Sequence, residues 1–169
     1  MRPRHLRTLV LALALAGLAG CRPNANPGEA ASTKPFPESS AQIPELRRGG
    51  VDWTDGEVRA FYVRRVAAIG PADAQRKKEG MPALDRARLA FQSRREARLL
   101  ARAMMKEGAE VEALRQRDRQ KYGDPDGPTF DSLVAHEQQK GLTGDAVYEA
   151  VIASAQRTDR ALNEALGIQ

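Results

Sequence analysis

Apolar residues recur at helical spacing over most of the chain after residue 51, and no stretch there alternates apolar and polar residues for long enough to indicate a strand. Residues three or four positions apart fall on one face of a helix, so this spacing produces a stripe that packs against a core. The pattern predicts an all-α domain over residues 52–169, a small bundle of four to five helices after a disordered tether. These 118 residues can enclose one small core.

The first predicted helix begins after Thr54 and ends at Gly70-Pro71. Thr54 and Glu57 have the spacing of a capping box, in which each side chain accepts a hydrogen bond from the other residue's backbone. A polar, charged stretch then runs to Gly80. The apolar face of this helix consists of Val58, Phe61, Tyr62, Val66 and Ile69.

The second predicted helix begins near Pro82 and extends to about Tyr122. Gly108 lies within this span, and a glycine inside a helix costs up to about 1 kcal/mol relative to alanine. The sequence therefore leaves open whether the helix is continuous through Gly108. Its apolar stripe consists of Leu89, Ala97, Leu100, Met104 and Val111.

Two more helices are expected after a turn-rich segment. The pattern predicts a short helix over residues 129–140 and a last helix that is capped by Thr143 and ended by Gly167. The apolar face of the last helix consists of Val147, Val151, Ala155, Leu162 and Leu166.

The first 20 residues combine three arginines with an apolar run over residues 9–19, which is the composition of a secretory signal peptide. The run is about half the length that a membrane span requires. The chain's only cysteine comes directly after it. It closes a motif that resembles the lipobox of bacterial lipoproteins, formed by Leu18, Ala19, Gly20 and Cys21.

The resemblance to bacterial lipoproteins implies that the chain is cleaved before Cys21 and that Cys21 carries acyl chains, of which about two give stable membrane anchoring. In that family an Asp after the cysteine often retains the protein in the inner membrane. Here the residue is Arg22, so the resemblance implies an outer-membrane location, facing the periplasm or the cell surface. Residues 21–51 contain five prolines and little apolar pattern, and we expect them to form a flexible tether.

Removal of the predicted signal peptide changes what composition implies. The formal net charge falls from +5 to +2, with 24 Lys and Arg against 22 Asp and Glu, so basicity gives no support for a nucleic-acid partner. Lipidation would use the only thiol, and His136 would be the only histidine left. We therefore predict no disulfide, no metal site and no cofactor.

Basic side chains form a strip on the side of the second helix opposite to its apolar stripe. One interpretation is an exposed strip that contacts anionic lipid headgroups, glycan phosphates or an acidic protein. The other is a solvated helix face with partners inside the domain, such as Glu96. It is favoured because residues 86–121 carry 11 basic and 5 acidic residues while residues 122–169 carry 3 basic and 8 acidic. The candidate basic strip consists of Arg88, Arg95, Arg98, Arg102 and Lys106.

The segment YGDPDGPTFD, residues 122–131, is the most distinctive loop of the chain. Its spaced aspartates begin like a calcium loop, but Pro128, Thr129 and Ala135 break the EF-hand pattern, and Asp, Gly and Pro are ordinary turn residues. Because loops often carry binding residues, we take it as a candidate contact surface. The candidate residues are Tyr122, Asp124, Asp126, Phe130 and Asp131.

The sequence supplies no convincing catalytic set. Ser132 and His136 are neighbours on one helix, but a Ser–His pair also needs an orienting carboxylate and an oxyanion hole. A glycan-cleaving enzyme needs a buried glutamate, for which Glu137 is the candidate. No further motif surrounds any of these residues.

These features predict a membrane-anchored envelope lipoprotein with a non-enzymatic role, binding another envelope protein or assisting assembly. The alternative is a lipoprotein that acts on the envelope itself, as a glycan-cleaving enzyme or as a toxin or immunity factor passed between cells. A deep acidic pocket around Glu137 would favour the enzyme. A shallow apolar groove beside Tyr122 and Phe130 would favour the binding protein.

Overall fold

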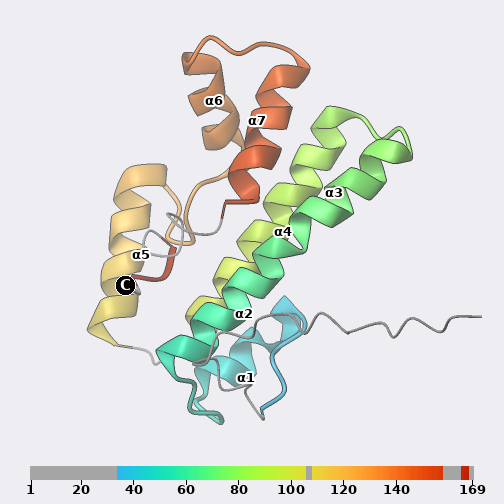
Figure 1. Cartoon of the computed structure of the whole chain (residues 1–169). Coiled ribbons are helices and arrows are strands. Elements are labelled where there is room, and N and C mark those ends of the chain that lie inside the picture. Colours follow the sequence, from blue (N-terminus) through green and yellow to red (C-terminus); the bar gives the residue numbers. More distant parts are fainter. Residues whose placement is uncertain (1–33, 106–107, 158–164, 168–169) are drawn as a thin grey trace, which may run out of the picture. The chain divides into compact units, whose positions relative to one another are not determined.

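A long helix, α4 (Ala83–Met104), runs through the described part of the chain and contacts helices from both ends of the sequence (Figure 1). The computed structural model describes residues 34–105, 108–157 and 165–167. These residues form helices and turns and contain no strand, which confirms the predicted all-α fold. All of them belong to one unit, Ser32–Gln169.

The other helices are arranged around α4. Three helices pack along it: α2 (Asp55–Ala67), α3 (Ile69–Lys78) and α7 (Asp145–Ala155). In turn, α6 (Phe130–Gln139) packs against α7. Near α2 the short α1 (Ile43–Arg47) also contacts α4, and α5 (Ala109–Tyr122) follows α4 in the chain. The largest fully buried apolar side chains are those of Tyr62, Phe61, Leu100, Leu166, Val58, Val66 and Val151.

Two predicted helix starts are confirmed. The Thr54 hydroxyl accepts a hydrogen bond from Glu57 N at 3.2 Å, and Glu57 Oε2 accepts one from Thr54 N at 2.8 Å, which completes the capping box of α2. At the start of α6 the Thr129 hydroxyl accepts a hydrogen bond from Ser132 N at 3.1 Å. Both caps join residues three positions apart, so the local sequence determines them.

Gly70-Pro71 do not end the first helix as predicted: α2 ends slightly earlier, at Ala67, and Gly70 and Pro71 lie inside α3. Ala68, between α2 and α3, keeps right-handed helical dihedrals (φ −70°, ψ −16°), and helical structure continues to Lys78. Pro71 lies in the first turn of α3, where the missing N–H of proline leaves no helical hydrogen bond unmade. It is α3 that ends beside Gly80, whose φ of +79° is the left-handed conformation that glycine supplies at helix ends.

The chain does not continue as one helix through Gly108. In the structure α4 ends at Met104 and α5 begins at Ala109, and Gly108 between them is extended, with φ −174°. The question that the sequence left open is thereby answered with two helices. Because glycine has a low helix propensity, a break in the helix at this position costs little free energy.

The predicted cap and length of the last helix are both wrong. Gly144, not Thr143, precedes α7, and no side chain caps it. The helix ends at Ala155, well before Gly167. Leu166 is nevertheless fully buried in the core, as its place in the apolar pattern suggested. Leu162 lies outside the described residues.

The helical domain begins earlier than the predicted boundary at residue 51. Phe36 stacks on Trp53 with ring centroids 5.4 Å apart and contacts Phe61 at 5.7 Å. A short 3₁₀ helix, Ser40–Gln42, leads into α1, whose Leu46 packs against the core. Residues 34–51 therefore fold on the helices instead of forming a tether, because aromatic burial offsets the cost of ordering them. Residues 21–33 lie outside the described residues.

We expect Thr54→Ala to lower the free energy of unfolding by about 1 kcal/mol, because Glu57 N loses its acceptor. Thr143→Ala is the matched control, since no side chain caps α7. Urea denaturation of both variants measures the difference. Equal losses in the two variants would contradict the assignment of the caps.

Candidate functional site

Four arginines of α4 are buried. Arg86, Arg94, Arg98 and Arg102 are 3%, 7%, 8% and 5% exposed. Arginine stays charged in a protein, so each buried guanidinium must find hydrogen-bond acceptors among its neighbours. The partners that these four side chains find determine how the loops and later helices lie against α4.

Arg86 holds α3 and α7 together. Its guanidinium donates to Asp73 Oδ1 at 2.9 Å and also hydrogen-bonds Glu149 of α7. The hydrogen bond from Arg86 lowers the pKa of Glu149 below its ordinary value. Burial would lower the pKa of Arg86, but the two carboxylates outweigh it and raise that pKa.

Arg102 joins three separate segments at one point. It donates to Asp118 Oδ2 of α5 at 2.6 Å, to Ala165 O at 2.9 Å and to Pro125 O at 3.1 Å. The Arg102 and Asp118 side chains are 5% and 3% exposed, so this is a buried ion pair. Removal of one partner of such a pair strongly destabilises a protein, because the other charge is left buried.

The loop between α5 and α6, residues 123–129, is fastened to α4 by three arginines. Arg95 binds Asp124 Oδ2 at 2.9 Å, Arg98 donates to Asp126 O at 2.9 Å, and Arg102 reaches Pro125 O. Burial would raise the pKa of Asp124, but the N–H of Asp126 and the guanidinium of Arg95 outweigh it and lower that pKa. We call this segment the fastened loop.

The residues of the candidate basic strip do not form one exposed surface. Arg98 and Arg102 are buried, and Arg95 is half-buried against Asp124. Only Arg88 among the described members is exposed, 3.9 Å from Asp85 of the same helix. Lys106 lies outside the described residues.

Most of the candidate loop residues make contacts within the domain. Asp124 accepts hydrogen bonds from Arg95 and from the N–H of Asp126. The ring of Phe130 lies edge-on to that of Phe91, with centroids 5.7 Å apart, and Tyr122 is half-buried. Asp131 is exposed.

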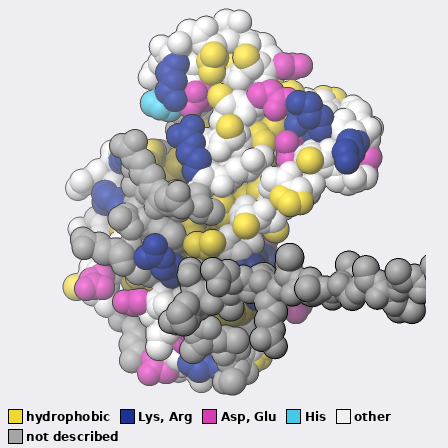
Figure 2. All heavy atoms as spheres, viewed as in Figure 1, with side chains coloured by type: hydrophobic (Ala, Val, Ile, Leu, Met, Phe, Trp, Pro, Cys, Tyr) yellow, Lys and Arg dark blue, Asp and Glu magenta, His cyan; other side chains and the backbone are white. Residues whose placement is uncertain are grey.

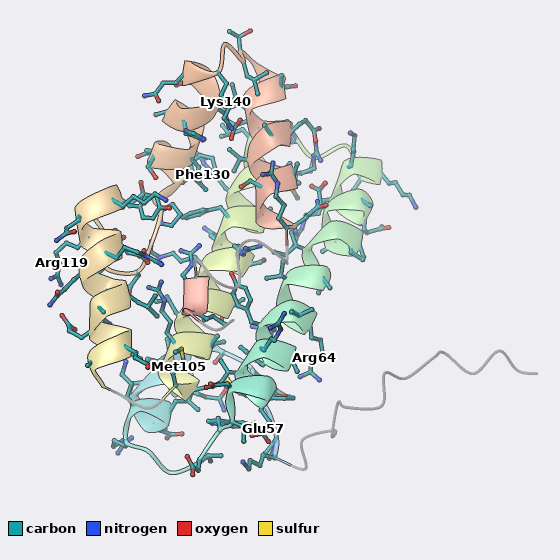
Figure 3. All side chains as sticks on the ribbon, turned by 60° about the vertical axis from the view of Figure 1, so that its left-hand side comes forward. Glu57, Arg64, Met105, Arg119, Phe130 and Lys140 are labelled. Atoms are coloured by element: carbon teal, nitrogen blue, oxygen red, sulfur yellow. The ribbon has the colours of Figure 1, made fainter. Side chains whose placement is uncertain are left out.

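A cavity of about 660 Å³ lies beside the fastened loop, among residues of α4, α5, α6 and α7. Side chains of α4, α5 and α6 meet in this region. Phe130 begins α6, Lys140 follows its last residue, and Arg119 lies on the outer side of α5 (Figure 3). It is neither the acidic pocket nor the apolar groove considered above, because its described charged residues are mainly basic. The acidic ones are Asp118 and Glu137, and the basic ones are Arg94, Arg98, Arg102, Arg117, Lys121, Lys140 and Arg157.

The residues considered for catalysis, Ser132, His136 and Glu137, line this cavity, and the polar atoms of Ser132 and Glu137 are engaged in hydrogen bonds. Ser132 Oγ donates to Thr129 O at 2.9 Å, so its proton is directed away from His136. Glu137 is 8% exposed, but it accepts a hydrogen bond from Lys140 Nζ at 2.8 Å. The other acid, Asp118, is bound by Arg102. Both carboxylates are thus held by cations.

Comparison with known proteins adds no family. No protein-family model matches the chain, and neither the curated proteins nor the solved structures include a match. In the described ranges no group of three or more His, Cys, Asp or Glu could hold a metal ion. No helix in the described part of the chain combines the length and apolarity of a membrane span.

Sequence reasoning missed the cavity and several residues that build it, above all Arg94 and Asp118. One signal was present: Arg94, Arg98 and Arg102 follow one another at four-residue intervals, the spacing of a single helix face. We call these three residues the arginine row. The ion pair with Asp118 had no comparable signal, because its partners come together only when α5 folds back after Gly108.

We expect Gly127→Ala to destabilise the domain by about 1–3 kcal/mol more than Gly141→Ala. Both glycines have a positive φ, +102° and +88°, but only at Gly127 would a Cβ meet the Arg98 guanidinium, at 2.2 Å. The methyl group would displace Arg98 from Asp126 O. Chemical denaturation of both variants is the measurement, and equal destabilisation would contradict the close contact between loop and guanidinium.

Proposed function

We propose that the protein is an envelope lipoprotein, anchored through Cys21, that binds another envelope protein and has no enzymatic role. The observation that carries this proposal is the fastened loop. Three arginines of one helix hold Asp124, Pro125 and Asp126 in place. A loop ordered in advance loses little conformational entropy when a partner binds, so it suits recognition.

The described surface supports a polar contact rather than an apolar one. Val51 is the only large hydrophobic residue among the described ones that is exposed. Basic and acidic side chains are interspersed with small hydrophobic areas over α6, α7 and the end of α3 in the space-filling view (Figure 2). Transient interfaces are about as polar as the rest of a protein surface, so this pattern is compatible with reversible binding.

The lipid anchor would place this surface close to the membrane. Lys34, the first described residue, comes 13 positions after Cys21. Even a fully extended chain of that length spans only about 45 Å. We therefore propose a partner in or near the same membrane as the lipid, not one at the far side of the envelope.

No observation favours the glycan-cleaving alternative. An inverting or retaining glycosidase needs two carboxyl groups free to exchange protons on either side of a sugar. At the cavity Glu137 is paired with Lys140, and Asp118 with Arg102. The binding role is the better supported of the two.

The lipid anchor is tested by metabolic labelling of cells with an alkyne-tagged palmitate. We expect the wild-type chain to be labelled and Cys21→Ser to carry no label, because the motif contains the only thiol of the chain. Arg22→Asp is the control, since it leaves Cys21 in place and should keep the label. Labelling of Cys21→Ser would contradict the proposed attachment point.

The partner is tested by crosslinking in intact envelopes, with the full-length lipidated chain as bait and mass spectrometry as the measurement. Asp131 is exposed in the first turn of α6, next to the fastened loop, so Asp131→Lys should abolish capture of a dominant envelope protein. Asp145→Lys is the matched control, because Asp145 is also exposed in the first turn of a helix, α7. Recovery of cell-wall fragments in place of a protein would overturn the proposal.

A further inference from the structure

Two of the four buried arginines lack a carboxylate partner among the described residues. Arg94 donates to the backbone oxygens of Ala155 and Arg157, and Arg98 donates to Asp126 O. By contrast, Arg86 and Arg102 each bind at least one carboxylate within 3 Å. Carbonyl oxygens orient a guanidinium, but they do not neutralise its charge.

The lack of a carboxylate within hydrogen-bond distance, among the described residues, has an electrostatic consequence at Arg98. Burial lowers the pKa of its guanidinium, and the charges of Arg102 and Arg94 lower it further, while Tyr62 and Asp118 only partly oppose this shift. Arg94 is also incompletely satisfied, since its buried Nε has no hydrogen-bond partner. An anion within hydrogen-bond distance stabilises a buried cation in such surroundings.

Both arginines line the 660 Å³ cavity. They are four residues apart on α4, so they occupy the same face of the helix. The cavity wall also contains apolar side chains from three helices, among them Phe91, Leu133 and Val151. A volume of this size is typical of small-molecule sites, which combine an apolar wall with a few polar groups.

We propose that the cavity binds a small amphipathic anion, a phosphate or carboxylate group carried on an apolar body. The charged group binds at Arg94 and Arg98, where planar guanidinium forks match its oxygens. The apolar body packs against Phe91, Leu133 and Val151. The size of the cavity favours such a small ligand over the acidic face of a folded protein. This site is independent of Cys21 and of the partner proposed above, so a failed crosslinking experiment would leave it standing.

Calorimetric titration of the full-length protein in non-ionic dodecyl maltoside micelles tests the proposal. The probes are phenyl phosphate, phenol and inorganic phosphate, which share either the ring or the charge. We expect phenyl phosphate to bind about tenfold more tightly than inorganic phosphate, and phenol not to bind detectably. Equal binding of phenyl phosphate and phenol would overturn the anion site. Equal binding of phenyl phosphate and inorganic phosphate would overturn the amphipathic character of the ligand.

Two variants that change the charge of the cavity wall in opposite directions separate loss of the site from loss of the fold. Lys140→Gln removes a half-exposed cation at the cavity and should weaken phenyl phosphate binding by about fivefold. Glu137→Gln removes a negative charge from the same wall and should strengthen it by about two- to fivefold. A variant that merely damages the fold cannot bind more tightly, so weaker binding by Glu137→Gln would overturn the proposal.

The arginines themselves supply the sharpest comparison. Arg98→Lys keeps the charge but loses the planar fork, and we expect about tenfold weaker binding of phenyl phosphate. Arg88→Gln on the same helix is the control, because Arg88 is 58% exposed and does not line the cavity. Circular dichroism and thermal denaturation verify that both variants fold. Equal affinity of folded Arg98→Lys and wild type would contradict the assigned binding residues.

Discussion

The burial of arginine on α4 is the constraint on which the rest of the domain depends. Of the 22 residues of this helix 12 are buried, more than one apolar stripe supplies, so its polar side is buried as well. Each buried guanidinium needs acceptors, and those of α4 find them on different segments: α3 and α7 for Arg86, the end of α7 for Arg94, the fastened loop for Arg98, and α5 for Arg102. The arginines thereby add polar links to helices that also pack on α4, such as α7, and hold the fastened loop against it.

The parts of the fold that sequence predicted are those that depend on near neighbours. The caps at Thr54 and Thr129 each involve a residue three positions away; the sequence predicted the first as a cap and the second as the start of a helix. Phe36 was assigned to a tether because its partners, Trp53 and Phe61, lie 17 and 25 positions further on. No local pattern indicates such a contact. The proline at position 71 was misread for a related reason: whether it ends a helix or sits in a first turn depends on where the helical path resumes.

For the candidate site too, the local sequence pattern was not enough to predict which side chains are buried. In a single sequence the side of a helix opposite its apolar stripe is taken to face solvent, and the basic strip was placed there on that ground. That assumption holds for a helix with neighbours on one side only. α4 has neighbours along more than one side, and alanines such as Ala90 and Ala97 let them approach closely. The four-residue spacing of the arginine row was visible in the sequence, but its burial follows from the number of helices around it.

The two kinds of buried arginine have different physical consequences. A pair such as Arg102 and Asp118 cancels its own charge, so its effect is confined to the fold. Arg94 and Arg98 are held by backbone carbonyls, which fix the direction of the N–H groups, and among the described residues neither has a carboxylate within hydrogen-bond distance. In a cavity with apolar walls their positive charge is weakly screened and acts on whatever enters. Oriented donors with positive charge are what a preformed anion site requires, because the ligand then binds without any rearrangement of the domain.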